Sequence, residues 1–300
     1  MMEASGIFVI DKPVGAPSQA AITAVRRCFS MRKVGHCGTL DPLASGVLPV
    51  MLGSATRACD FLMDHEKEYT AVVRLGLVTD TEDITGEVIS RFDGTLPSFA
   101  EFKAVAEQFQ GELWQVPPMY SALKKNGQKL VDLARKGVVL EREKRKIFIR
   151  SIRAYEEDGL FKLDVCCSRG TYIRTLCADI GRKLGCGACM EELRRTRVGQ
   201  FDLSAAVTLE DLRAMTEEQA KAHLIPVEQV FLQYPALRLP AFYEKLYHNG
   251  ERIAVRKIGL KDASVGDRFR VYGEAGFYSL GEIGLFEDEA RLFSKITFPL

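Results

Sequence analysis

Hydrophobic residues near the N-terminus occur in two patterns that predict a strand followed by a helix. Residues 6–10 (GIFVI) form an apolar run typical of a short buried strand, and the turn-forming residues 11–15 follow it. A helix is predicted from Ser18, the expected N-cap, to Phe29, because apolar residues recur there every three to four positions. Both elements should contribute to one core.

The chain up to about residue 235 continues with strand-like and helix-like patterns, which predicts an α+β fold. Ser98 is the expected N-cap of a helix to about residue 110. Residues 190–196 are expected to be helical or close to it. The other predicted elements are strands at 68–75, 145–155 and 160–167, a helix at 129–136, a helix ending at 184 and a helix beginning at 208.

Residues 35–49 (GHCGTLDPLASGVLP) fit neither periodicity. Three glycines and two prolines exclude a helix, yet four large apolar residues in the stretch need cover. Long irregular segments with buried anchors are usually functional. Asp41 lies at the centre, and Pro42 keeps it out of the α region. An Asp-Pro pair is also an ordinary turn signal, so at this point both interpretations stay open.

After residue 235 the chain changes in texture. Seven glycines between 250 and 284 separate short β-type runs at 268–272, 277–283 and 290–297. This spacing predicts a small β-barrel or sandwich. We therefore expect two domains, residues 1–235 and residues 236–300.

Composition places the chain among ordinary globular proteins. It has 300 residues, 47% of them hydrophobic and 27% charged. No run approaches the ~18 apolar residues of a membrane span, and the N-terminus shows no signal-peptide pattern. The expected location is the cytoplasm, with no membrane contact.

Cysteine and histidine usage favours chemistry without a metal. Eight cysteines in a chain of this length do not make a small disulfide framework, so we expect them to be reduced. Cys186 and Cys189 have the spacing of a zinc or redox pair, but no second pair accompanies them. The four histidines are scattered.

Positive charge is concentrated in one segment although the whole chain carries a net charge of only +1. Residues 121–153 contain eleven Lys and Arg against three acids, a local balance of +8. A solvated helix face beside a charged strand edge would give this pattern. The clustering with Tyr120, Ser121 and two glycines favours an electrostatic footprint for phosphates.

Polar residues stand on apolar, turn-rich backbone at three places: Asp41, Tyr69 and residues 170–174 (GTYIR). A buried carboxylate needs a cation or several N–H donors to stay ionised. Arg174, at the start of an apolar helix, is a credible bidentate partner for Asp41. Considered singly, each residue also fits a structural role, namely a salt bridge for Arg174 and core packing for Tyr69.

A series of short motifs resembles one known family. In chain order they are DKPVG at 11–15, GHCGTLDPLASGVL at 35–48, KEY at 67–69, TDT at 79–81, PPMYSALK at 117–124, ARKG at 134–137, CSRGTYIR at 167–174 and LRR at 193–195. Together they resemble the TruB-type tRNA pseudouridine synthases over nearly the whole chain. The glycine-punctuated tail is similar, more loosely, to the PUA-type RNA-binding β-barrel that often ends these enzymes.

The resemblance implies a pseudouridine synthase fold with a central, mainly antiparallel sheet flanked by helices, an RNA-gripping insertion at about 85–140 and a small C-terminal barrel. It implies an isomerase that converts uridine 55 in the T arm of tRNA to pseudouridine. The N-glycosidic bond is broken and the base is rejoined through carbon, without cofactor or metal. The target base must be flipped out of its stack, at a cost of a few kcal/mol.

The resemblance also implies roles for individual residues. Asp41 matches the essential aspartate, which acts either by covalent attack or by taking a proton from the ribose. Arg174 matches the arginine that pairs with it. Tyr69 matches the tyrosine that stacks on the target base.

Four further positions match the family pattern around the pocket. His36 matches a histidine that helps to fill the place left by the flipped base, and Lys12 a lysine that supports the active-site loop. Tyr172 and Leu193 match pocket-lining positions. Pro17 departs from the hydroxyl residue that is common beside the Lys12 motif.

Rival functions remain at this point. A guide-RNA-dependent relative would resemble the chain around Asp41 but usually lacks an insertion like residues 85–140. A non-catalytic RNA-binding protein or RNA chaperone would not need Asp41, Tyr69 and Arg174 together. A glycosidase would want two facing carboxylates. We therefore expect a stand-alone, monomeric enzyme that binds tRNA and has no obligatory protein partner.

Overall fold

The main body of the computed structural model is organised around one large sheet. The structure describes residues 4–121, 123–125, 127–134, 136–138, 140–260 and 262–298. The strands of the sheet are β1 (Gly6–Lys12), β2 (Val34–His36), β3 (Ser45–Leu52), β4 (Lys67–Leu75), β7 (Gly111–Gln115), β10 (Arg145–Glu157), β11 (Leu160–Cys167), β12 (Ala188–Val198), β13 (Phe201–Asp202) and β14 (Val207–Thr208).

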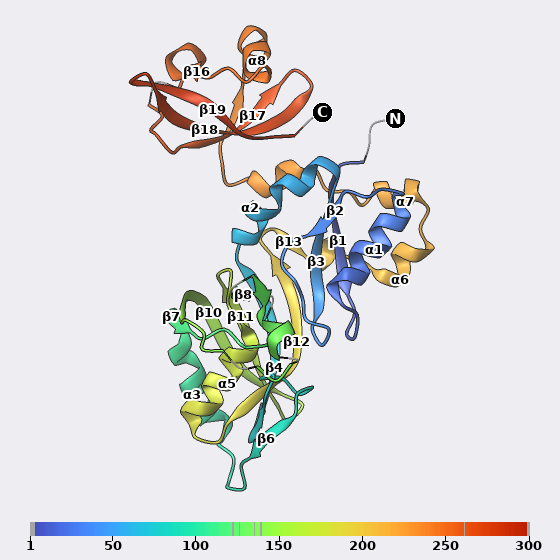
Figure 1. The fold of residues 1–300 in the computed structure, drawn as a ribbon, viewed down its shortest axis with the longest axis vertical. Helices are drawn as coiled ribbons and strands as arrows, with labels where there is room; N and C mark the ends of the chain where they lie inside the picture. The colour runs from blue at the N-terminus through green and yellow to red at the C-terminus, as the bar shows by residue number, and fades with distance from the viewer. Residues whose placement is uncertain are drawn as a thin grey trace.

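These strands form a ten-stranded sheet in the spatial order β14-β1-β3-β12-β4-β11-β10-β7, with β2 paired to β3 and β13 paired to β12 (Figure 1). All pairings are antiparallel except β1 with β14 and β3 with β12. The expected central, mainly antiparallel sheet is confirmed.

Helices flank this sheet at both ends. The α-helices are α1 (Ser18–Cys28), α2 (Cys59–Asp64), α3 (Phe99–Ala106), α4 (Leu130–Ala134), α5 (Ile173–Leu184), α6 (Leu209–Ala214), α7 (Glu217–Lys221) and α8 (Ala241–His248). Short 3-10 turns lie at η1 (Gly53–Ala58), η2 (Glu107–Phe109), η3 (Leu203–Ala205), η4 (Val227–Phe231) and η5 (Val255–Ile258). Figure 1 shows α1 grouped with α6 and α7 at one end, and α3 with α5 at the other.

Two small hairpins extend from the body. The first pairs β5 (Leu77–Thr79) with β6 (Val88–Arg91), and the second pairs β8 (Lys124–Lys125) with β9 (Gln128–Lys129). The second hairpin corrects the expected helix at 129–136, since Lys129 pairs in β9 and the helix begins at Leu130. The expected helix after Ser98 is confirmed, with the Ser98 and Glu101 side chains forming a reciprocal capping box.

Residues 190–196 are not helical. They lie in β12, which pairs with β4 on one side and with β3 on the other. The pattern misleads because β12 is interior to the sheet and is buried against α5, so pairing partners that are distant in sequence decide its conformation. The pairing places Arg195 opposite both Tyr69 and Gly46.

The expected C-terminal β region is confirmed as a curled five-stranded sheet that lies apart from the main sheet in Figure 1. Its strands are β15 (Ala236–Arg238), β16 (Ile253–Ala254), β17 (Arg268–Gly273), β18 (Gly276–Phe286) and β19 (Glu289–Thr297), in the order β15-β17-β18-β19-β16. Phe231 in η4 joins it to the main body, because its ring packs against Phe61 from α2 and against Phe277 and Phe298.

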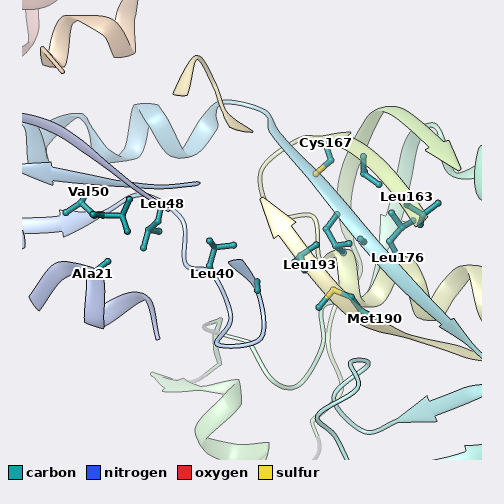
Figure 2. Packing of buried hydrophobic residues seen from close by; sticks show 14 of the residues in the cluster. Ala21, Leu40, Leu48, Val50, Leu163, Cys167, Leu176, Met190 and Leu193 are labelled. Carbon is teal, nitrogen blue, oxygen red and sulfur yellow. The ribbon is translucent and has the colours of Figure 1, made fainter. Parts of the chain in front are cut away.

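The largest hydrophobic core in the main body contains two groups of side chains with Leu40 between them. Figure 2 shows Leu40 between Ala21, Leu48 and Val50 on one side and a second group on the other. That second group comprises Leu163, Cys167, Leu176, Met190 and Leu193. Leu40 immediately precedes Asp41, so burial of its side chain between these two groups fixes the backbone next to Asp41.

Ser18 does not cap α1 as expected. Pro17 occupies the N-cap position, and Ser18 is the first helical residue. The Ser18 hydroxyl is buried, donating to the Leu40 carbonyl at 2.8 Å and accepting from the Leu40 N–H at 2.9 Å. A hydroxyl that can both donate and accept is therefore used to hold the residue before Asp41 instead of capping its own helix.

In the part of the chain that the structure describes, no helix is both long and apolar enough to span a bilayer.

Replacing Ser18 tests this anchor. Ser18→Ala leaves the buried N–H and carbonyl of Leu40 without their partner, so we expect the free energy of unfolding to fall by ~1–3 kcal/mol in urea titrations. Thr23→Ala is the matched control, since the Thr23 hydroxyl bonds the Gln19 carbonyl of its own helix. Equal stability losses in the two variants would contradict the anchor.

Candidate active site

Backbone hydrogen bonds fix the position of the segment that carries Asp41. Its described residues run between β2 and β3, and the Pro42 carbonyl accepts from the Gly15 N–H at 2.8 Å. The Ala44 N–H donates to the Asp41 carbonyl at 3.0 Å, which closes a turn directly around the aspartate. Asp41 thus sits on a short turn whose base is tied to the residues after β1.

Lys12 adds further hydrogen bonds to the base of this turn. Its fully buried ammonium donates to the carbonyls of Ala16 at 2.7 Å, Pro13 at 2.9 Å and Pro42 at 3.4 Å. Burial lowers the pKa of Lys12 to about 8, while the nearby Asp41 charge partly opposes this shift. Lys12 therefore joins the turn at residues 13–16 to the segment that contains Asp41.

Arg174 contacts Asp41 as predicted from the sequence, but through one contact and not through the expected bidentate pairing, because its two Nη groups bind backbone carbonyls. Its Nε lies 3.0 Å from Asp41 Oδ2. Its Nη1 donates to the Thr81 carbonyl at 3.0 Å, and its Nη2 donates to the Tyr120 carbonyl at 2.8 Å. The Arg174 side chain is only 6% exposed, whereas that of Asp41 is 42% exposed. The guanidinium is therefore a buried support, and the carboxylate faces solvent.

Asp83 is a second carboxylate on Arg174 that sequence reasoning missed. Its Oδ2 lies 3.6 Å from Arg174 Nη1, and its side chain is 8% exposed. Its Oδ1 accepts from the hydroxyls of Thr81 and Thr85 and from the Thr85 N–H. Asp83 is thus locked in place before it meets the arginine. The TDT motif at 79–81, just before it, was the available signal.

Gln115 was also missed, and it fixes the start of α5. Its buried side-chain amide accepts from the Tyr172 N–H at 2.8 Å and donates to the Tyr172 carbonyl at 3.1 Å. Tyr172 is the N-cap residue of α5 and provides no side-chain cap of its own. Gln115, at the end of β7, instead holds both backbone groups of this N-cap residue, two positions before Arg174.

Arg195 ties the two flanks of the Asp41 segment together. Its side chain is almost completely buried, with Nε donating to the Val47 carbonyl at 2.7 Å and Nη2 to the Gly38 carbonyl at 3.0 Å. Gly46 is required beside it, because a Cβ there would lie 2.1 Å from the Arg195 carbonyl oxygen. The sequence showed Arg195 within a motif, but gave no sign of this role.

Tyr69 lies opposite Arg195, on the neighbouring strand β4. Burial raises the pKa of its phenol, and the positive charge of Arg195 partly opposes this shift. The phenol is therefore protonated at neutral pH and presents an aromatic ring to the site.

His36 lies at the end of β2, and burial lowers the pKa of its imidazole, with the Arg195 charge as a smaller cause. The ring is thus neutral near pH 7. Its buried Nδ1 has no hydrogen-bond partner among the described residues.

A cleft of about 530 Å³ opens over these groups. Of the residues predicted from the sequence, it brings together Asp41, Tyr69, Tyr172, Arg174 and Leu193. His36 and Lys12 do not line it. Its wall also includes Lys67, Tyr120, Arg145, Arg169 and Arg195, so the cleft combines aromatic rings with positive charge.

Acidic side chains from other parts of the chain partly neutralise the positive charge of the basic segment 121–153. Lys146, Arg150 and Arg153 pair with Glu112, Glu66 and Asp164, which lie on other parts of the chain. Arg145 instead lines the cleft. Arg135 lies outside the described residues.

Asp41 is the one acid among the described residues that line the cleft, and its carboxylate is exposed. Asp83 sits behind Arg174 and is nearly buried, so the two carboxylates do not face each other across a substrate as a glycosidase requires. Within the described ranges, no group of three or more His, Cys, Asp and Glu side chains could hold a metal ion.

Comparison with known proteins gives the family. A profile described as the N-terminal domain of TruB family pseudouridylate synthase matches residues 26–173. A profile of the tRNA pseudouridylate synthase B C-terminal domain matches residues 174–232. The tRNA pseudouridine synthase B of Clostridium tetani is 40% identical over 279 residues, covering 93% of this chain and 95% of its own.

The chain belongs to the TruB family of pseudouridylate synthases. The tRNA pseudouridine synthase B of Burkholderia pseudomallei is 42% identical over 271 residues, covering 89% of each chain. The resemblance seen in the sequence motifs is therefore confirmed, and the chain is an isomerase of the pseudouridine synthase class.

Solved structures similar to this TruB family member come from larger assemblies. A chain in the crystal structure of a Cbf5-Nop10-Gar1 complex superposes with a TM-score of 0.74 at 28% identity, covering 98% of this chain and 85% of that one. A chain in the structure of an H/ACA RNP bound to a substrate RNA containing 2'-deoxyuridine gives a TM-score of 0.71 at 25% identity, with 98% and 85% covered. The fold is thus that of pseudouridine synthases.

Arg174→Lys tests the clamp on Asp41. The single ammonium of a lysine cannot contact Asp41, Asp83 and two carbonyls at the same time, as the planar guanidinium does. We therefore expect kcat to fall by roughly 100-fold, which corresponds to ~2.7 kcal/mol of activation free energy. Single-turnover assays on tRNA transcript would measure it, with Arg182→Lys on the exposed face of α5 as control. A wild-type kcat for Arg174→Lys would contradict the role of Arg174 in holding Asp41.

Arg195→Lys tests the tie between the flanks of the Asp41 segment. One ammonium on a shorter side chain cannot reproduce both bonds to Val47 and Gly38, and an unpaired buried carbonyl costs ~1–3 kcal/mol. We expect kcat to fall by about tenfold or more while the dissociation constant for RNA is retained. The same loss in binding as in turnover would argue against this positioning role, as would no change in either.

Proposed function

We propose that this chain converts uridine 55 in the T arm of tRNA to pseudouridine, with Asp41 as the group that acts on the flipped-out nucleotide. The observation that carries the proposal is the Arg174–Asp41 pair. A buried guanidinium contacts a solvent-facing carboxylate in a cleft large enough for a nucleotide.

The other residues of the cleft take complementary roles in this proposal. Tyr69 provides the surface on which the target base stacks, which is worth ~1–3 kcal/mol per base. Tyr172 and Leu193 line the pocket around that base. Lys12 supports the turn below Asp41, and His36 helps to fill the position that the flipped base leaves.

RNA binding in this proposal extends beyond the cleft. Residues 1–235 carry the reaction, with the segment at about 85–140 gripping RNA, and residues 236–300 form a second RNA-binding domain. In this proposal Arg145 on the cleft wall meets a phosphate, and Arg169 does so once it leaves its ion pair with Asp64. The enzyme acts in the cytoplasm as a monomer, without cofactor, metal or membrane.

Independence from a guide RNA and from protein partners is part of the proposal. Two of the structural neighbours are chains of a Cbf5-Nop10-Gar1 complex and of an H/ACA RNP bound to a substrate RNA. The relatives with 40–42% identity over about nine-tenths of the chain are named tRNA pseudouridine synthase B. The stand-alone tRNA enzyme is therefore favoured over the guide-dependent one.

Tritium release from 5-tritiated uridine in an unmodified tRNA transcript tests this function. Wild-type protein without added metal, nucleotide or partner should release tritium, and Asp41→Asn should release none above a protein-free blank while it still binds the transcript. Asp158→Asn, which removes an exposed charge from the turn between β10 and β11 outside the RNA-gripping segment, is the matched control.

Each alternative gives a different result. Loss of RNA binding together with activity in Asp41→Asn would make Asp41 structural. No release by the wild type, with RNA still bound, would favour the guide-dependent or RNA-chaperone function. Release from a transcript whose T-arm uridine is replaced by cytidine would contradict the assignment of the site of modification.

A further inference from the structure

Two cysteine side chains approach each other closely, and one of them, Cys37, belongs to the segment that carries Asp41. Cys37 Sγ lies 2.7 Å from Cys59 Sγ, and both are free thiols. Cys37 comes between His36 and Gly38, and Cys59 is the first residue of α2. A disulfide bond is ~2.04 Å long, so the sulfur atoms need to move together by only roughly 0.7 Å.

The two thiols differ in solvent exposure and in the direction of their pKa shifts, and this difference favours oxidation of one cysteine before the other. Cys37 is completely buried, whereas Cys59 is partly exposed at the edge of the same core. The hydrogen bond from the Cys37 thiol lowers the pKa of Cys59, and the same contact raises the pKa of Cys37. Cys59 is therefore the thiol that supplies a thiolate and that an oxidant can reach.

We propose that Cys37 and Cys59 are a modification site at which a hydroperoxide forms a reversible disulfide, and that this disulfide slows the reaction at Asp41. The Cys59 thiolate attacks one peroxide oxygen; the O–O bond breaks, giving a sulfenic acid on Cys59 and an alcohol or water. Cys37 then attacks the Cys59 sulfur and expels water. Two thiols lose two electrons and two protons, and the hydroperoxide is reduced.

The position of the pair connects it to turnover. The Cys59 thiol also lies 3.3 Å from the His36 carbonyl as a donor, and the Gly38 carbonyl accepts from Arg195. A disulfide removes that thiol donor and ties residue 37 covalently to α2. Drawing the two sulfur atoms together moves residue 37 toward α2 and so displaces its neighbour Gly38, whose bond to Arg195 helps to position the Asp41 segment. This second half of the inference rests on the proposed function, whereas disulfide formation does not.

Thiol counting by mass spectrometry tests the modification itself. The reduced protein is exposed to a brief pulse of hydrogen peroxide, alkylated, reduced with dithiothreitol and alkylated again with a second reagent. We expect the second label on Cys37 and Cys59 together. Cys28→Ser, which removes another partly exposed thiol from α1, should leave this result unchanged.

Two variants keep the test informative if one of them folds poorly. In Cys59→Ser no disulfide can form, so residue 37 should carry only the first label; Cys37→Ser should leave Cys59 as a sulfenic acid that dimedone traps. First label alone on both cysteines of the peroxide-treated wild type would overturn the modification site.

Activity provides the separate readout. Peroxide should lower tritium release by the wild type at least about fivefold, dithiothreitol should restore it, and Cys59→Ser should be insensitive. Full activity of the oxidised wild type, with the disulfide present, would overturn the regulatory half alone. Absence of release from the reduced protein would count against the proposed function and not against the disulfide.

Discussion

The site depends on one buried positive charge. Removing a guanidinium from water is expensive unless charges and hydrogen bonds replace the lost hydration. At Arg174 two carboxylates and two backbone carbonyls do so, and they come from segments that are far apart in the sequence. Satisfying the guanidinium therefore requires the Asp41 turn, the residues around Thr81 and the loop at Tyr120 to converge on the start of α5.

The same principle operates twice more below Asp41. Lys12 and Arg195 are buried cations that bind almost entirely backbone carbonyls of the turn and its flanks. Carbonyls of an irregular segment have no sheet or helix partner, so each needs another donor. Long basic side chains provide these donors from neighbouring strands. The segment can thus remain irregular without leaving its polar backbone unpaired.

The sequence was sufficient for those parts of the site that depend on local chemistry. Glycines and prolines marked the Asp41 segment, and Arg174 followed from its place at the start of an apolar helix. Ser18, Asp83 and Gln115 could not be found in this way, because their partners lie 22, 91 and 57 residues away. The strand nature of residues 190–196 was hidden for the same reason, since β3 and β4 decide it. The resemblance contributed residue roles, but not these long-range contacts.

The distribution of charge shows how the cleft can select RNA without a highly basic surface. Pairing of Lys146, Arg150 and Arg153 with acids outside residues 121–153 lowers the local balance from +8 to +5. Exposed ion pairs of this kind contribute little to stability but cancel long-range attraction for phosphate. For every phosphate that the protein does not neutralise, the slope of log affinity against log salt becomes shallower by ~0.7–0.9. Recognition must then depend more on the shape of the cleft and on its aromatic residues than on the number of basic residues counted along the sequence.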